Sequence, residues 1–171
     1  MGMFDNFPYN AKQEDIVMEI RPAKKLGFGL MRLPLMSDGT IDEAQLEEMV
    51  AYAMANGINY FDTAHIYSDS EEKLGLALHD VRDKIIISTK AMTTTVEGFW
   101  EQLHTSLKRL QTDYIDIYQF HNPAFCPKPG GEDGLYDAAL EAQAQGKIRH
   151  ISITNHRLAV AKEAVESGLY E

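Results

Sequence analysis

Two patterns of hydrophobic and polar residues alternate along most of this chain. Short apolar runs, such as those at residues 85–88 and 114–120, are each followed by a stretch in which apolar residues recur every three or four positions. The short runs are typical of buried strands, and the longer stretches are typical of amphipathic helices. The pattern predicts strands near residues 26–30, 58–61, 85–88, 114–120 and 148–153, and helices over residues 41–56, 71–78, 99–110, 135–145 and 158–167.

Local signals mark where several of these helices begin and end. Thr40 and Glu43 form the Thr-x-x-Glu pattern of a capping box, in which each side chain binds a backbone N–H group of the other residue. They predict that Thr40 caps the first helix. Gly57, Gly146 and Gly168 follow helical stretches, where glycine commonly ends a helix.

Five strand-then-helix units in succession indicate an α/β fold with a parallel sheet. The chain has neither the GxGxxG nor the GxxxxGK[ST] pattern of phosphate-binding loops, so a (β/α) barrel of the TIM type is favoured over a doubly wound fold. A closed barrel has eight units and about 250 residues. We therefore predict an incomplete barrel of about five units over residues 26–171, preceded by an N-terminal arm or hairpin at residues 1–25.

Composition narrows the range of partners and compartments. The 171 residues include 16 Lys and Arg against 26 Asp and Glu, which gives a formal net charge of −10 at pH 7. Nucleic acids and anionic membranes bind basic surfaces, so we expect neither as a partner. The single cysteine, Cys126, cannot form an intrachain disulfide, and no apolar run is long enough for a membrane span. A cytoplasmic protein is expected.

Polar side chains of complementary chemistry stand at the ends of four predicted strands. Asp62, Lys90, His121 and Asn155 each close a strand, one βα unit after another. The carboxyl ends of parallel strands meet at one rim of the sheet, where the active sites of α/β proteins are built. An acid, an amine, an imidazole and an amide are therefore expected close together.

The local motifs around these residues are more specific than their spacing. Six motifs occur in order: LGFGLMRLP at 26–34, FDTA at 61–64 with Tyr67, EKLGLAL at 72–78, ISTK at 87–90, SLKRL and TDYID at 106–116 before His121, and IRHISITNH at 148–156. In content and order this set resembles the aldo/keto reductase superfamily over about residues 26–171. The opening motif and His121-Asn122 are most similar to members that carry an added iron–sulfur region.

The resemblance implies a function and a set of catalytic residues. It implies an NAD(P)H-dependent oxidoreductase that reduces small aldehydes or ketones to alcohols by hydride transfer. It places Asp62, Tyr67, Lys90 and His121 in the catalytic tetrad, with Tyr67 as the proton donor, and it implies no metal.

These residue types suit that chemistry. Hydride transfer to a carbonyl creates an alkoxide that needs a proton, and a phenol with a pKa of about 10 is a weak acid at neutral pH. The Lys90 ammonium beside Tyr67 is expected to lower the pKa of its phenol, and Asp62 is expected to keep Lys90 charged and in place. His121 is expected to donate to the carbonyl oxygen and to orient it.

The resemblance also implies a nicotinamide cofactor, with NADP(H) favoured over NAD(H). Thr154 and Asn155 match the Ser-Asn pair that holds the nicotinamide carboxamide, and Asp62 lies at the cofactor as well. In the family the contacts to the pyrophosphate and adenosine come from later βα units, and the cysteines of an iron–sulfur cluster would lie there too. We therefore expect residues 1–171 alone to bind the cofactor weakly and to be inactive.

We also expect residues 1–171 to self-associate through unpaired barrel edges near Leu26 and Ile151.

Three other functions remain open at this point. A metal-dependent barrel hydrolase would use carboxylate and imidazole ligands, here Asp62, His65, His121 and His156, but it leaves the lysine–tyrosine pair without a role. Lys90 could instead form a Schiff base, as in barrel aldolases. The third alternative is a non-catalytic barrel that serves as a binding subunit. Thr154 and Asn155 could also cap the last helix instead of binding a cofactor.

Overall fold

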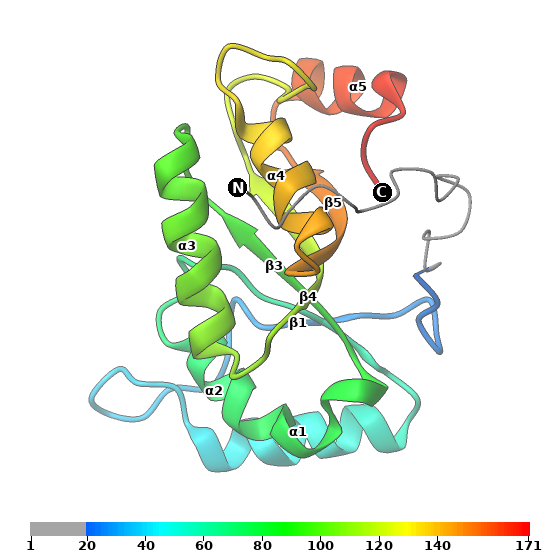
Figure 1. Cartoon of the computed structure of the whole chain (residues 1–171). Coiled ribbons are helices and arrows are strands. Elements are labelled where there is room, and N and C mark those ends of the chain that lie inside the picture. The colour runs from blue at the N-terminus through cyan, green and yellow to red at the C-terminus, as the bar shows by residue number, and fades with distance from the viewer. Residues whose placement is uncertain (1–19) are drawn as a thin grey trace, which may run out of the picture.

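The computed structural model describes residues 20–171, which form alternating strands and helices (Figure 1). In chain order the elements are β1 (Phe28–Gly29), α1 (Glu43–Ala55), β2 (Tyr60–Asp62), α2 (Ser70–Leu78), a 3-10 helix (His79–Lys84), β3 (Ile86–Ala91), α3 (Val96–Arg109), β4 (Ile115–His121), α4 (Leu135–Ala144), β5 (Ile148–Thr154) and α5 (Leu158–Ser167). Each predicted strand-then-helix unit is present.

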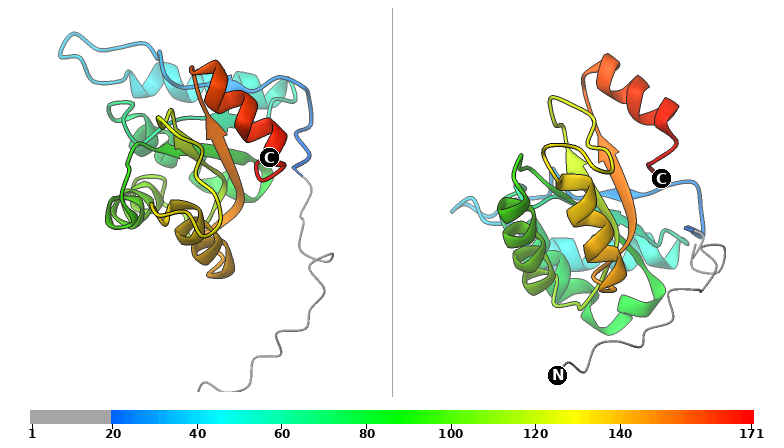
Figure 2. Two further views of the ribbon diagram at one scale, coloured as in Figure 1. Left: turned by 90° about the horizontal axis from the view of Figure 1, so that it is seen from above. Right: turned by 45° about the horizontal axis from the view of Figure 1, so that its top comes forward.

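The strands form one parallel sheet in the order β1-β2-β3-β4-β5. Each strand pairs with the one that precedes it in the chain, without the reversal of order that defines a doubly wound sheet. Helix α1 packs against α2, α2 against α3, and α3 against α4, and Figure 2 shows the helices arranged around the curved sheet. This is the arrangement of consecutive units in a (β/α) barrel, as predicted.

The main hydrophobic core lies between the sheet and the helices. Phe61 on β2 and Ile87 on β3 are register partners and are buried, and they belong to one cluster with Leu74 and Leu103 from the helices. Neighbouring residues of a strand point to opposite faces of a sheet. The residue after Phe61, which is Asp62, therefore lies on the face away from this core.

Helix α1 begins later than the capping box predicts. Asp42 is its N-cap, and the Asp42 side chain accepts a hydrogen bond from the N–H of Gln45 at 3.1 Å. Thr40 is engaged elsewhere, because its hydroxyl and its N–H both donate to the carboxylate of Asp38. Ile41 lies in an isolated antiparallel bridge and is held out of the helix. Aspartate caps a helix at least as well as threonine, so contacts outside the helix decide between the two residues.

The strand boundaries differ from the predicted ones in a way that matters for the site. Strand β2 starts at Tyr60 and contains Asp62, and β3 continues through Lys90 to Ala91. Parallel pairing with the adjacent strand carries β2 and β3 past the apolar runs at residues 58–61 and 85–88 from which these strands are predicted. Most of the N-terminal arm predicted for residues 1–25 lies outside the described residues, and residues 20–25 form neither strand nor helix. None of the described helices has the length and apolar character needed to cross a membrane.

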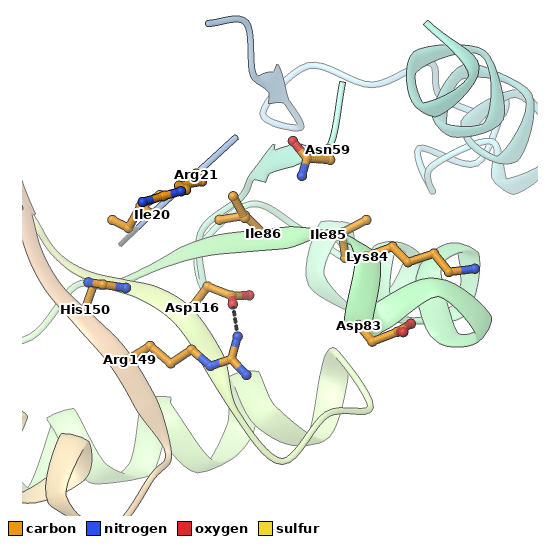
Figure 3. A pocket seen from close by; sticks show the side chains of 10 residues that line it. All are labelled: Ile20, Arg21, Asn59, Asp83, Lys84, Ile85, Ile86, Asp116, Arg149 and His150. Carbon is orange, nitrogen blue, oxygen red and sulfur yellow. Dashed lines mark hydrogen bonds and ion pairs between the residues drawn. The ribbon is translucent and has the colours of Figure 1, made fainter. Parts of the chain in front are cut away.

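A hollow of about 240 Å³ lies at the amino-terminal ends of the strands (Figure 3). Its lining includes Arg21, Asp116 and Arg149, and it includes none of the site residues that the sequence predicts. The candidate chemistry is therefore at the opposite end of the strands from this hollow.

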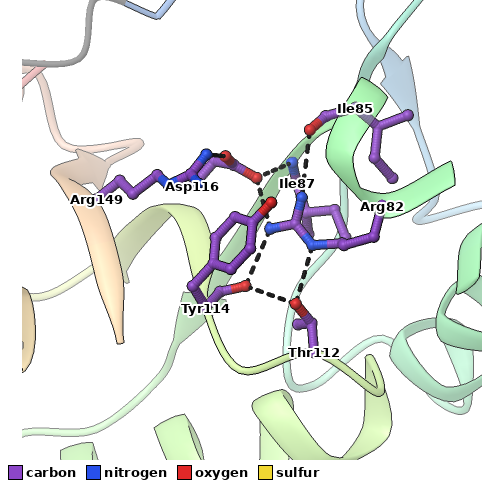
Figure 4. A network of polar contacts seen from close by, with 7 residues as sticks. All are labelled: Arg82, Ile85, Ile87, Thr112, Tyr114, Asp116 and Arg149. Atoms are coloured by element: carbon purple, nitrogen blue, oxygen red, sulfur yellow. Dashed lines mark hydrogen bonds and ion pairs between the residues drawn. The ribbon is translucent and has the colours of Figure 1, made fainter. Parts of the chain in front are cut away.

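A buried carboxylate beside the hollow ties β3, β4 and β5 together (Figure 4). Asp116 is 5% exposed, and one of its oxygens accepts from Arg82 at 2.7 Å and from the N–H of Ile87 at 2.9 Å. Its other oxygen accepts from Arg149 at 2.8 Å. The two guanidinium groups lie over the ring of Tyr114, 3.9 and 3.8 Å from its centroid. One carboxylate thus pairs with two guanidinium groups and joins three strands.

Replacement of Asp116 with alanine should lower the free energy of unfolding by about 2–4 kcal/mol, because Arg82 and the N–H of Ile87 lose their acceptor in the interior. This loss of unfolding free energy is smaller than the largest losses seen for fully buried ion pairs, because the Arg149 side chain is 37% exposed. Urea denaturation measures it. Asp113→Ala, at an exposed position just before β4, is the matched control and should change stability by less than about 0.5 kcal/mol. Equal losses in the two variants would contradict the role of the network.

Candidate active site

Three of the predicted site residues lie on neighbouring strands, near their carboxyl ends. Asp62 is the last residue of β2, Lys90 is the last but one of β3, and His121 is the last of β4. Alternation along each strand places them on the face opposite the core residues Phe61 and Ile87. The parallel sheet thereby brings an acid, an amine and an imidazole to one rim, as the strand-end pattern predicts.

An ion pair between Lys90 and Asp62 stands at the centre of this group. The Lys90 ammonium donates to an Asp62 carboxylate oxygen at 2.5 Å and to the carbonyl oxygen of Thr63 at 2.6 Å. The Lys90 side chain is 6% exposed, whereas that of Asp62 is 33% exposed. A buried ammonium is stable only with such partners, so Asp62 holds the lysine in place, as predicted.

Two further side chains hold the other oxygen of Asp62, and the sequence analysis missed both. Gln119 on β4 donates to this oxygen at 3.1 Å, and the hydroxyl of Ser88 on β3 donates to it at 3.0 Å. Gln119 also donates to the Ser88 hydroxyl at 2.6 Å. The sequence does contain a signal that could have identified them. Each lies two residues before a predicted site residue on the same strand, so its side chain points to the same face of the sheet. Donors from β3 and β4 therefore fix the Asp62 carboxylate.

Tyr67 lies in the segment that joins β2 to α2, beside the ion pair. Its ring centroid is 5.2 Å from the Lys90 ammonium. The ring of His121 meets it edge-on, with the centroids 5.9 Å apart and the planes at 85°. The base of the segment is closed by a hydrogen bond of 2.8 Å between the hydroxyls of Thr63 and Ser70. The structure thus brings all members of the predicted tetrad together.

The electrostatics of Tyr67 differ from the expectation. Burial raises the pKa of its phenol above the usual 10.0, and the negative charge of Asp62 raises this pKa further. The expectation that Lys90 lowers the pKa of Tyr67 is wrong for this structure, because the ammonium is directed to Asp62 and to the Thr63 carbonyl, where its charge is balanced. The phenol therefore keeps its proton at neutral pH.

The imidazole of His121 favours the neutral form and has a buried nitrogen without a partner in the described part of the chain. Burial lowers its pKa below 6.5, the positive charge of Lys90 lowers it further, and the negative charge of Asp62 acts in the opposite direction. Among the described residues, the buried Nδ1 atom of His121 has no hydrogen-bond partner. Buried polar atoms are normally paired, so this nitrogen is an exception within the tetrad.

The predicted nicotinamide pair continues the rim on β5. Thr154 is the last residue of β5 and the register partner of His121. Both ends of the Asn155 amide bind backbone: its Nδ2 donates to the Pro123 carbonyl at 2.7 Å, and its Oδ1 accepts from the N–H of Arg157 at 2.8 Å. The N-cap of α5 is Arg157, so the alternative in which Thr154 or Asn155 caps this helix is wrong. Their contact with a nicotinamide stays a prediction.

The ligand set considered for a metal hydrolase does not assemble. Within residues 20–171, no three His, Cys, Asp or Glu side chains are grouped so that they could hold a metal ion. One of the candidate ligands, His65, instead lies with its Nδ1 atom 3.9 Å from the carboxylate of Glu71.

Relatives of known name match the chain along most of its length. The family model described as "Aldo/keto reductase family" matches residues 25–171. The chain is 32% identical over 169 residues to Protein tas of Escherichia coli (strain K12), with 76% of this chain and 48% of that protein covered. It is 35% identical over 158 residues to the "Uncharacterized oxidoreductase YqkF" of Bacillus subtilis (strain 168), with 84% and 49% covered. The chain thus spans about half the length of the curated relatives it matches.

A solved structure shares the fold. The aldo-keto reductase from Klebsiella pneumoniae in complex with NADPH superposes with a TM-score of 0.68 at 26% identity, and the match covers 80% of this chain and 47% of that one. The five βα units described above correspond to part of a (β/α)8 barrel of this kind. Because the family model matches from residue 25 to residue 171, this chain belongs to the aldo/keto reductase family.

Proposed function

We propose that this chain carries the proton-donating side of a carbonyl reductase site in an NAD(P)H-dependent oxidoreductase. The observation that carries the proposal is the buried ion pair of Lys90 and Asp62 beside Tyr67 and His121, at the carboxyl ends of adjacent strands. Membership of the aldo/keto reductase family supports the same activity. The proposed reaction is the reduction of a small aldehyde or ketone to an alcohol.

Each side chain of the tetrad has a role in this reaction. Hydride transfer to the carbonyl carbon places negative charge on the carbonyl oxygen. The phenol of Tyr67, which its raised pKa keeps protonated at neutral pH, donates its proton to that oxygen. The neutral ring of His121 donates a hydrogen bond to the same oxygen and orients the carbonyl. The ion pair of Lys90 and Asp62 is the fixed polar group beside the phenol, with the ammonium 5.2 Å from the centroid of the Tyr67 ring.

A bound nicotinamide cofactor supplies the hydride in this proposal. We assign Thr154 and Asn155 to its carboxamide and Asp62 to the same end of the cofactor. The position of Thr154 across from His121 in the sheet register supports this assignment. NADP(H) is proposed in preference to NAD(H), with support from the NADPH complex of the Klebsiella pneumoniae reductase.

Two other expectations from the sequence also stay proposals. We place the protein in the cytoplasm, in keeping with the free and buried state of Cys126. The added iron–sulfur region stays a prediction of the resemblance alone.

Tyr67→Phe, made in the protein that carries this sequence, should lower the turnover of a simple aldehyde by about 10²-fold or more, because it removes the general acid. The affinity for NADPH should change little, because the aromatic ring is retained. Initial rates from NADPH absorbance and fluorescence titration measure the two effects. Tyr52→Phe, at a tyrosine that is 74% exposed on α1, is the matched control and should leave both unchanged. Wild-type turnover in Tyr67→Phe would refute the assignment.

The His121 imidazole should titrate with a pKa below 6.5, because burial and the charge of Lys90 both disfavour the imidazolium. Lys90→Met should raise this pKa, because the positive charge of Lys90 no longer disfavours the imidazolium, whereas burial and His156 still lower the pKa and Asp62 still raises it. NMR titration of the ring nitrogens measures both values. The folded state binds this proton more weakly than the unfolded state, so the stability contribution of His121 is lost as the pH falls from about 6.5 through the folded-state pKa. A midpoint at or above 6.5 in the wild type would contradict the burial argument.

We also propose that the chain self-associates through the outer strands of its sheet. In the sheet formed by residues 20–171, β1 and β5 are the outer strands. Leu26, Met31 and Leu35, which flank β1, are 61%, 62% and 61% exposed. The β5 edge is less open than expected, because the N–H of Glu171 donates to the carbonyl of Ile151 at 3.2 Å. The β1 edge is therefore the better place for a second copy of this chain.

Sedimentation at tens of micromolar should detect this association. Leu26→Lys should weaken it, because a charge beside an outer strand opposes edge-to-edge pairing. Val165→Lys, at a position 82% exposed on α5, is the matched control and should leave it unchanged. A wild-type monomer at these concentrations would count against the proposal.

A further inference from the structure

A polar cluster behind the sheet contacts the segment that carries Tyr67. One guanidinium nitrogen of Arg109, at the end of α3, donates to the Glu71 carboxylate at 3.3 Å and to the carbonyl oxygen of His65 at 3.1 Å. Glu71 lies in the first turn of α2 and is 1% exposed. Its charge is thus almost wholly removed from water, and a carboxylate buried in this way requires a cationic partner. That partner also binds the backbone two residues before Tyr67.

The cluster also contacts β3, at the Thr89 side chain and at the Lys90 carbonyl group, so that these contacts form a closed ring. The hydroxyl of Thr89 donates to the second oxygen of Glu71 at 2.7 Å. The N–H of His65 donates to the carbonyl oxygen of Lys90 at 3.1 Å. The peptide groups of His65 are therefore held at both ends, by β3 on one side and by Arg109 on the other. Since Thr89 and Lys90 point to opposite faces, the ring fastens the Tyr67 segment from the helix side.

Gly75 on α2 allows the close contact between helices on which this ring depends. A Cβ atom at Gly75 on α2 would lie 2.4 Å from the carbonyl oxygen of Arg109 and 2.8 Å from the backbone of Leu110. Such distances are too short for any side chain, so only glycine allows α2 and the end of α3 to come this close. The close approach brings the base of Arg109 to within reach of Glu71.

We propose that Arg109 and Glu71 are positioning residues for Tyr67: the ring they form sets the distance of the Tyr67 segment from Lys90. The effect on turnover rests on the proposed function, whereas the effect on the segment itself does not. The Arg82–Asp116 pair serves as an internal comparison, because it also joins an arginine to a buried carboxylate but lies at the amino-terminal ends of the strands.

Amide hydrogen exchange in the chain without any ligand tests the positioning directly. Arg109→Met should speed exchange of the His65 and Tyr67 amides by about tenfold or more, while the Tyr118 amide in the middle of β4 keeps its rate. Arg82→Met, the matched control, should leave the amides of residues 65–67 unchanged. Should Arg109→Met fail to fold, Glu71→Gln, which keeps the shape of the side chain and removes its charge, is judged by the same criterion.

An equal rise at His65 and Tyr118 would mean that Arg109 stabilises only the fold as a whole, and it would overturn the proposal. Unchanged exchange at His65 in both Arg109→Met and Glu71→Gln would do the same.

Kinetics separate this proposal from the proposed function. With an aldehyde and NADPH, Arg109→Met should lower kcat by about tenfold with little change in the KM for NADPH, and Arg109→Lys, which keeps the charge, should recover part of the loss. In the background of Tyr67→Phe, Arg109→Met should cost almost nothing more, because the group it positions is gone. If Tyr67→Phe proves harmless, the proposed function fails and the exchange data alone decide the positioning. If Tyr67→Phe is slow but Arg109→Met keeps the wild-type kcat, the positioning proposal is overturned.

Discussion

The burial of one ammonium group within the rim of the sheet is the constraint on which the site depends. The Lys90 side chain is 6% exposed, and a cation removed from water to that extent requires both a countercharge and hydrogen-bond acceptors. Asp62 and the Thr63 carbonyl supply them, and Ser88 and Gln119 in turn hold the free oxygen of Asp62. The geometry of three strands is thus organised around a single charge.

Buried charges are paired in the same way at two other places around the sheet. At the amino-terminal ends of the strands, Asp116 pairs with two arginines and joins β3 to β5. On the helix side, Glu71 pairs with Arg109 and binds β3 through Thr89. Each buried carboxylate is satisfied by donors from elements that are distant in the sequence. These contacts require the layers to pack in one register, because a shift of one residue would leave a charge without its partner.

Burial and the ion pair together set the protonation states around the rim. The pKa of Tyr67 is raised by burial and by Asp62, and the pKa of His121 is lowered by burial and by Lys90. At neutral pH the rim therefore presents a protonated phenol and a neutral imidazole beside a balanced ion pair. Two neutral donors next to a fixed ion pair form an environment that favours negative charge developing on a carbonyl oxygen. This is the requirement of the reaction proposed for a member of the aldo/keto reductase family.

Periodicity and chain order are local properties, and they suffice to predict the succession of βα units, the barrel-type order of the strands and the placement of Asp62, Lys90 and His121 at strand ends. Motif resemblance added Tyr67, whose loop position has no periodic signal. Tertiary contacts settle which donors reach Asp62, which residue caps α1, and in which direction the pKa of Tyr67 moves. The roles of Glu71 and Arg109 were likewise hidden, although both lie in or beside recognisable motifs. These features depend on how closely distant segments approach and how far they exclude water, and local sequence patterns carry neither quantity.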